Sequence, residues 1–161
     1  MIHTNPEIEV IVNDATASAK AQNHEYVTLE HLALSLVNYT PFNKLLADFG
    51  VEVVGLQHDL VTYINGQYYL ISKNPAYDSP RRTHALERVF NRAFTQVLFS
   101  GRSDMQVIDL FLSVASEGNS YAQYLYIKYG LDRQNLLAFY KQNYNEQKGT
   151  KEAINKKAQS I

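Results

Sequence analysis

Two histidines and two glutamates fall within the stretch "HEYVTLEH", residues 24–31, and these side-chain types can bind a metal ion or transfer protons. A zinc site needs several such ligands at one point, and His24 with a nearby carboxylate is the only candidate that the stretch offers. No HxxxH or HExxH spacing joins any two of the five histidines. Glu30 and His31 are neighbours that point about 100° apart on a helix, so they cannot orient each other as acid and base. The stretch therefore predicts surface histidines, no catalytic residue and no metal site.

A second group of charges lies in "THALERVFNRAFTQVLFSGR", residues 83–102. If its apolar residues form the buried face of a helix, Arg88 and Arg92 lie on the exposed face and next to each other. Two like charges in this position repel by roughly a few tenths of a kcal/mol. Glu25 and Glu30 would offset them or receive a basic partner. The charges indicate a protein-docking patch, with ordinary solvated surface charge as the alternative.

The composition limits the class of protein. The 161 residues fit one domain, and 15 Lys+Arg against 16 Asp+Glu give a net charge of −1, which predicts binding to neither nucleic acid nor membranes. The tail lysines and the many tyrosines leave nucleic-acid binding only as a weaker alternative. The chain has no cysteine, no apolar run of about 18 residues and no apolar leader in "MIHTNPEIEV". We expect a soluble cytoplasmic protein without disulfides.

The elements that position these side chains are predicted to be helices, because apolar residues recur at spacings of three and four. Thr28 is expected to cap one helix, Thr40 to cap the next with Pro41 in its first turn, and Glu52 to open a fourth. The expected ranges are 6–22, 29–38, about 41–49 and about 52–64, followed by a long connection over 65–82.

The second half of the chain repeats the first. An offset of 78 residues places Leu86 on Ile8 and Ala93 on Ala15, and it places "IDLFLSV" (108–114) on "EHLALSL" (30–36). After a two-residue insertion the offset is 80. Two such units would pack into one pseudo-two-fold, eight-helix, all-α domain. We predict a domain over 1–144, with repeats at 6–66 and 83–144, and a flexible linker or tail over 145–161.

A duplicated four-helix unit whose second helix opens with "EYVTLEHLALSLV" resembles the N-terminal domain of the Clp/Hsp100 AAA+ unfoldases, over about residues 6–144. Within that family, residues 83–102 are most similar to the ClpA pattern. The resemblance implies a non-catalytic domain, monomeric when isolated, that delivers adaptors and substrates to an unfoldase ring for protein degradation. The chain has no Walker A sequence, so we expect no cofactor here; ATP and Mg²⁺ would belong to AAA+ modules that this chain lacks.

The resemblance also implies partners. These are a ClpS-like adaptor, unfolded or N-degron proteins and, through a longer parent, a Clp peptidase ring. Position by position, it assigns the adaptor contacts to Glu25, Glu30, Thr83, Arg88 and Arg92. The alternative is a stand-alone protein of this family that binds adaptors or substrates without an ATPase.

One feature of the second repeat departs from the family. ClpC-type relatives carry a Thr-Glu-His turn in both repeats for phosphoarginine recognition, but the second repeat here reads "MQVIDL". The resemblance therefore does not imply a duplicate phosphoarginine site. Gln106 stands where Thr28 stands in the first repeat and is a poor helix cap, so Ser103 or Asp104 is expected to replace it.

Overall fold

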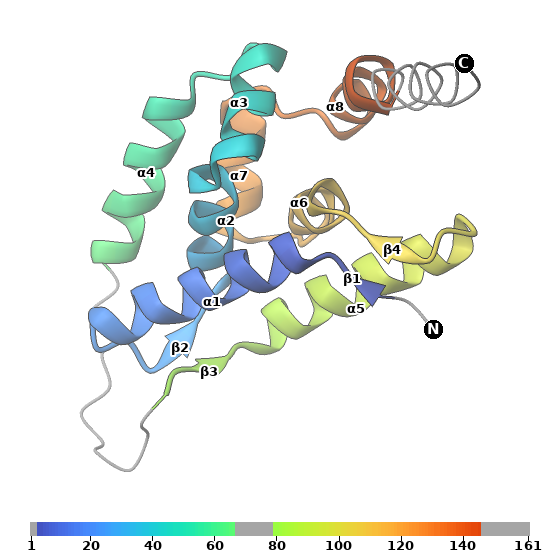
Figure 1. The fold of residues 1–161 in the computed structure, drawn as a ribbon. Helices are drawn as coiled ribbons and strands as arrows, with labels where there is room; N and C mark the ends of the chain where they lie inside the picture. The colour runs from blue at the N-terminus through green and yellow to red at the C-terminus, as the bar shows by residue number, and fades with distance from the viewer. Residues whose placement is uncertain (1–2, 67–78, 146–161) are drawn as a thin grey trace, which may run out of the picture.

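The computed structural model describes residues 3–66 and 79–145, and that part of the chain contains eight α-helices (Figure 1). This confirms the all-α, eight-helix prediction. The helices are α1 (Pro6–Ala21), α2 (Leu29–Asn38), α3 (Thr40–Phe49), α4 (Val53–Asn65), α5 (His84–Phe99), α6 (Val107–Ala115), α7 (Tyr121–Lys128) and α8 (Arg133–Tyr140), and a π-helical turn follows at Lys141–Asn145.

The helix ends follow the capping residues with two exceptions. Thr28 caps α2 and Glu52 caps α4, as predicted. Thr40 is the first residue of α3 and not its cap, because Tyr39 takes the cap position without a side-chain bond. Gly50 ends α3 at φ 105°, a left-handed conformation that glycine adopts without steric cost.

The cap of α6 also differs from the prediction. Gln106 itself occupies the cap position, and Ser103 and Asp104 do not. The Asp109 carboxylate accepts the backbone N–H of Gln106 at 2.8 Å. A carboxylate three residues into the helix thus satisfies the backbone donor at the cap, which relieves the need for Ser103 or Asp104 there.

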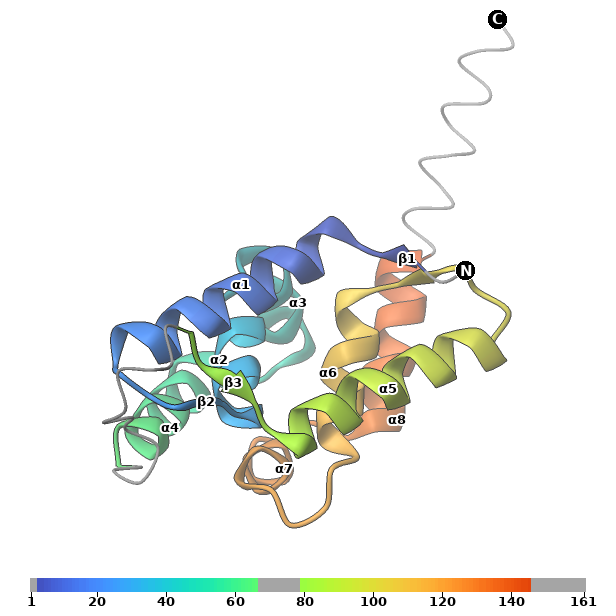
Figure 2. The same cartoon turned by 90° about the horizontal axis from the view of Figure 1, so that it is seen from below.

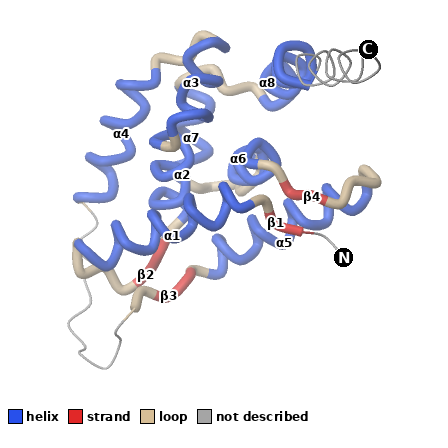
Figure 3. The backbone as a smooth tube through the Cα atoms, in the orientation of Figure 1, coloured by secondary structure: helices blue, strands red, loops and turns tan. Residues whose placement is uncertain are grey.

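In the described part of the chain, four two-residue strands link the two repeats, and the sequence did not predict them. β1 (His3–Thr4) pairs in parallel with β4 (Asp104–Met105), and β2 (Tyr26–Val27) pairs in parallel with β3 (Arg81–Arg82). Two residues are too few to show a period-two pattern. The offset of 78 maps β1 onto β3 and β2 onto β4. The two ladders lie near opposite ends of the α1 and α5 pair (Figure 3), so each repeat is tied to the other at two places.

The core lies around α2 and α6, which pack against each other at the centre (Figures 1 and 2). Ring contacts cross from one repeat to the other. Phe111 on α6 is 4.8 Å from Phe42 on α3 and 4.4 Å from Tyr126 on α7, between ring centroids. All three rings are buried. Because the cluster takes side chains from both repeats, we expect neither repeat to complete its core alone.

Two predicted segments lie mainly outside the described residues. Of the predicted connection, 67–78 are not described, while Arg81 and Arg82 form β3. Of the predicted tail, only Asn145 is described. The domain boundaries stay a prediction. Among the described residues, no helix combines the length and the apolar composition needed to cross a membrane.

Candidate partner-docking site

A groove of about 580 Å³ opens where the two repeats meet. Its walls come from Tyr26 and residues 28–30 at the start of α2, from residues 82–85 and Arg88 at the start of α5, and from residues 117–120 in the loop before α7. We call it the charged groove. The β2–β3 ladder brings the first two walls together, because it fixes the start of α2 beside the start of α5.

Glu117 organises the arginines of the charged groove. Its Oε1 accepts from Arg88 Nε at 3.0 Å, and its Oε2 accepts from Arg92 Nη2 at 2.9 Å. Arg92 Nη1 also donates to the Ser113 carbonyl at 2.9 Å. Burial alone would raise the pKa of Glu117, but the hydrogen bonds and charges of both arginines outweigh it and lower that pKa. The acid stays ionised and holds both guanidinium groups in place.

Glu117, rather than Glu25 or Glu30, is the acid that offsets the arginine pair, so the first of the two alternatives for these glutamates is wrong. The other alternative, that Glu25 and Glu30 receive a basic partner, stays a prediction. The Arg88 side chain is 58% exposed, as expected, but Arg92 is only 29% exposed. The prediction that both arginines are exposed therefore holds for Arg88, whereas Arg92 is only partly exposed. Arg92 lies one turn further along α5 and reaches the charged groove through Glu117.

Glu30 is a buried acid in the wall of the charged groove. The residue is 8% exposed, and burial raises its pKa to about 7, although a hydrogen bond from the Ala122 backbone opposes this rise. Its Oε2 is buried without a hydrogen-bond partner among the described residues, as is the hydroxyl of Tyr126. An acid in the first turn of α2 also benefits from the helix dipole. Glu30 is thus part charged and part neutral near pH 7.

Glu25 and Thr83 hold the edge of the charged groove. Glu25 forms an ion pair with Arg81 across the β2–β3 ladder, and the Arg81 guanidinium lies 5.1 Å from the centre of the Tyr26 ring. The Thr83 hydroxyl accepts the Leu86 backbone N–H at 3.1 Å and caps α5. Both side chains therefore stabilise the local structure as well as bordering the site.

The two histidines are buried, contrary to the surface positions predicted from the sequence. His24 Nδ1 lies 2.9 Å from His31 Nε2, and the Thr28 N–H donates to His31 Nδ1 at 3.0 Å. Burial lowers the pKa of both, and the neighbouring His24 helps to bring that of His31 to about 4. Within residues 3–66 and 79–145, no three His, Asp or Glu side chains gather in a way that could hold a metal ion.

The structure brings Glu30, Thr83 and Arg88 together in the charged groove, whereas Glu25 lies beside it. Sequence reasoning missed Glu117 and Arg81. Glu117 precedes the turn "GNS", where Asn119 has φ 61°, and such a turn signal marks a loop without revealing its partners. The ion pairs join residues 25 and 29 positions apart, which only the tertiary fold brings into contact.

Comparisons with known proteins agree with this architecture. The sequence model of the family described as Clp repeat (R) N-terminal domain matches residues 4–129. A "ClpA homolog protein" from Fuscovulum blasticum is 26% identical over 132 residues, which cover 82% of this chain and 17% of that relative. The chain therefore spans only a small part of the relative's length.

Two solved structures share the fold. The Hsp104 N-terminal domain from Candida albicans has a TM-score of 0.71 at 16% identity, with 88% of this chain and 90% of that chain covered. A ClpV N-domain in complex with a VipB peptide has a TM-score of 0.63 at 18% identity, with 83% and 81% covered. Because the family model covers most of the chain, this chain belongs to the Clp repeat N-terminal domain family.

Proposed function

We propose that this domain docks partner polypeptides for a Clp-type unfoldase, and that the charged groove is its contact surface for a ClpS-like adaptor. The observation that supports this most is the arrangement of Arg88, whose guanidinium is fixed by the buried Glu117 yet remains mostly exposed. A charged group held in place before binding loses little freedom on contact, so it favours both affinity and specificity.

The chemistry of the charged groove suits a polypeptide that presents acceptors. The outward face of the Arg88 guanidinium would donate to a carboxylate or carbonyl of the partner. The size of the groove and its position between two fixed helix starts suit a loop or chain end of the partner. The ClpV N-domain bound to a VipB peptide shows that a domain of this fold can hold a peptide, which supports the same role here.

The proposal extends to a longer protein of which this domain would be one part. A relative that is much longer than this chain supports a parent unfoldase with ATPase modules, to which the domain would bring adaptors and N-degron or unfolded substrates. The domain itself would do no chemistry. Its linker would raise the effective concentration of the captured cargo near the ring.

The test is to titrate a purified ClpS adaptor into the domain by isothermal calorimetry. Arg88→Gln should weaken binding at least about tenfold, because it removes the exposed guanidinium from the centre of the contact. Arg88 is a better target than Arg92, whose reversal to Glu would place a second carboxylate beside the buried Glu117 and disturb folding.

Arg102→Gln is the matched control. Arg102 is also a partly exposed arginine paired with an acid, Asp109, but it follows the opposite end of α5. The control should bind as the unmodified domain does, and thermal melting should show both variants folded. Equal binding by all three proteins, or equal losses in both variants, would rule out this groove as the adaptor site.

A further inference from the structure

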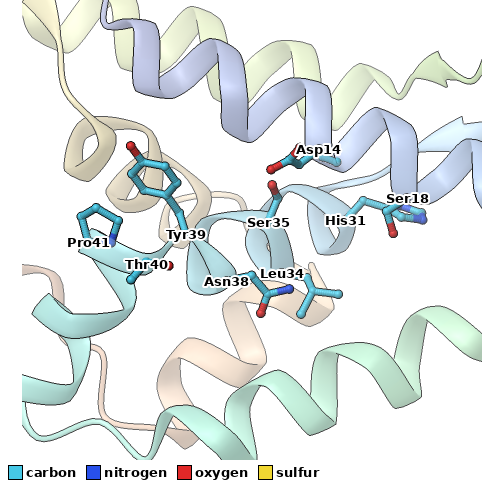
Figure 4. Close-up of a pocket in the computed structure, with 10 residues that line it drawn as sticks. Asp14, Ser18, His31, Leu34, Ser35, Asn38, Tyr39, Thr40 and Pro41 are labelled. Atoms are coloured by element: carbon cyan, nitrogen blue, oxygen red, sulfur yellow. The ribbon is translucent and has the colours of Figure 1, made fainter.

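A second pocket, of about 310 Å³, lies in the first repeat between α1, α2 and the start of α3 (Figure 4). Its polar lining includes Asp14 and Ser18 from α1, Ser35 and Asn38 from α2, and Tyr39 after it. Figure 4 shows the Asp14 carboxylate reaching from α1 toward Ser35. This pocket shares no lining residue with the charged groove.

The second repeat shows how the equivalent place is filled. The offset of 78 residues places Asp14 on Arg92, Ser35 on Ser113 and Tyr39 on Glu117. In the second repeat, the Arg92 guanidinium donates to the Ser113 carbonyl and to Glu117, at 2.9 Å in each case. A guanidinium group therefore occupies this position in one repeat, whereas the other repeat has a pocket there.

The two places are comparable because the helices around them pack alike. The Ser35 hydroxyl donates to the Ile11 carbonyl at 2.6 Å, and the Ser113 hydroxyl donates to the Val89 carbonyl at 2.7 Å. These bonds are equivalent under the same offset, and both join the first helix of a repeat to its second helix. The Ser35 carbonyl thus stands where the Ser113 carbonyl stands relative to the neighbouring helix.

The negative charge of the pocket is complementary to a guanidinium group, which is the group that fills the equivalent place in the second repeat. Asp14 puts a carboxylate where the second repeat has a cation, and a second acid, Glu7, is near enough to Tyr39 to contribute to the raised pKa of its hydroxyl. The pocket also faces the C-terminal turn of α2, which has no basic residue, and a helix C-terminus attracts cations. Among the described residues, no Lys or Arg forms an ion pair with Asp14.

We propose that the pocket between α1 and α2 binds the guanidinium group of an arginine side chain from a protein partner. Asp14 would supply the counter-charge, and the Ser35 carbonyl would be the second acceptor. Arginine fits better than lysine because its planar group donates in two directions at once, as Arg92 does to a carbonyl and a carboxylate. The domain would then carry two docking points, one in each repeat, and this one does not depend on the function proposed for the charged groove.

The probe is the capped tripeptide Ala-Arg-Ala, titrated into the isotope-labelled domain and followed by two-dimensional NMR. We expect saturable shifts of the backbone amides of Ser35, Asn38 and Tyr39. The tripeptide with citrulline, which has the same shape but no charge, should cause none of them. The lysine tripeptide should bind several times more weakly.

Two variants of one exposed residue sharpen the test. Asp14→Asn should weaken binding of the arginine tripeptide at least about tenfold, the size of a lost charge-assisted hydrogen bond. Asp14→Arg should abolish binding of the arginine tripeptide, because the domain's own guanidinium group would then occupy the pocket. Asp104→Asn, an exposed aspartate on β4, is the control and should leave binding unchanged.

Several results would overturn the proposal. These are the absence of saturable shifts at these amides at millimolar tripeptide, equal binding of the arginine and citrulline peptides, equal binding of the arginine and lysine peptides, or full binding by Asp14→Asn. Shifts confined to the charged groove would overturn it as well. Unchanged spectra far from residue 14 would show that each variant is folded.

Discussion

In the second repeat the Arg92 guanidinium joins the Ser113 carbonyl to Glu117, whereas the equivalent place in the first repeat is an open pocket beside Asp14 and Tyr39. The serine hydroxyl bonds of the two repeats and the two strand ladders, in contrast, correspond residue by residue. The contacts that hold the helices together have stayed alike, and the charged residues at the surface have diverged. The shared serine bonds and strand ladders are what the fold needs, whereas the surface charges that differ between the repeats are available for binding partners.

The charged groove shows the same divergence. Glu30, Arg88 and Glu117 correspond under the offset to Ile108, Val10 and Tyr39. The surface that the pseudo-two-fold relates to the charged groove therefore has no such ion-pair cluster at these positions, although it is built on equivalent helix positions. We expect an adaptor that binds through charged groups to distinguish the charged groove from the equivalent surface, because specificity arises from such differences in complementarity.

The largest expected effect tests whether the repeats form one unit. Phe111→Ala should lower the free energy of unfolding by about 4 kcal/mol, because the fully buried ring packs against both repeats and leaves a cavity. Urea unfolding followed by circular dichroism and by tyrosine fluorescence should show a single, coincident transition for this variant.

Phe99→Ala is the control for this prediction. Phe99 ends α5 and is 85% exposed, so its loss should change stability by less than about 0.5 kcal/mol. If Phe111→Ala instead gave two separate transitions, one for each half, the repeats would be independent and the comparison between them would lose its structural basis.

A smaller effect concerns Glu30, which has an isoleucine as its counterpart. Its pKa rises from 4.5 to about 7 in the folded protein, so between these values the folded chain holds a proton that the unfolded chain releases. Its contribution to stability is therefore present at low pH and is lost as the pH rises through 7. His31 acts in the opposite direction, because its pKa falls from 6.5 to about 4 and its contribution is lost as the pH falls through that window.

The Glu30→Gln variant should separate the effect of Glu30 on the pH dependence of stability from that of His31. The stability of the unmodified domain relative to the variant should fall by about 2–3 kcal/mol as the pH rises from 4.5 to above 7, as measured by urea unfolding at several pH values. The variant alone should become more stable between pH 4 and 6.5, because His31 then titrates without opposition from residue 30. A constant difference over the whole range would show that Glu30 keeps its ordinary pKa.

The smallest effect tests the shared contacts. Ser35→Ala and Ser113→Ala each remove one hydroxyl bond between the first and second helices of a repeat, so each should cost about 1 kcal/mol. The two losses should agree within about 0.5 kcal/mol in thermal or urea unfolding. A loss in only one repeat would mean that the two serines, despite their matching bonds, support the two repeats differently.

Much of this fold could be predicted because its helices are amphipathic and their ends carry capping residues. Ile8, Ala15, Leu86 and Ala93 are buried as their spacing indicates, and Thr28 and Glu52 cap as their side chains permit. The strands could not be predicted because two residues are too few to show an alternating pattern. The burial of His24 escaped notice because its partner, His31, lies seven residues away across a turn.

The sequence by itself determined the helices, the duplication and the family, because periodic apolar residues and local caps act over a few positions and can be read along the chain. Only the tertiary structure decided which acid pairs with Arg88 and Arg92, that Glu30 is buried, and that the place of Arg92 is an open pocket in the first repeat. Electrostatic partners are selected by distance in space and by burial, and residues 88 and 117 become neighbours only when α5 and the loop before α7 come together within the folded second repeat.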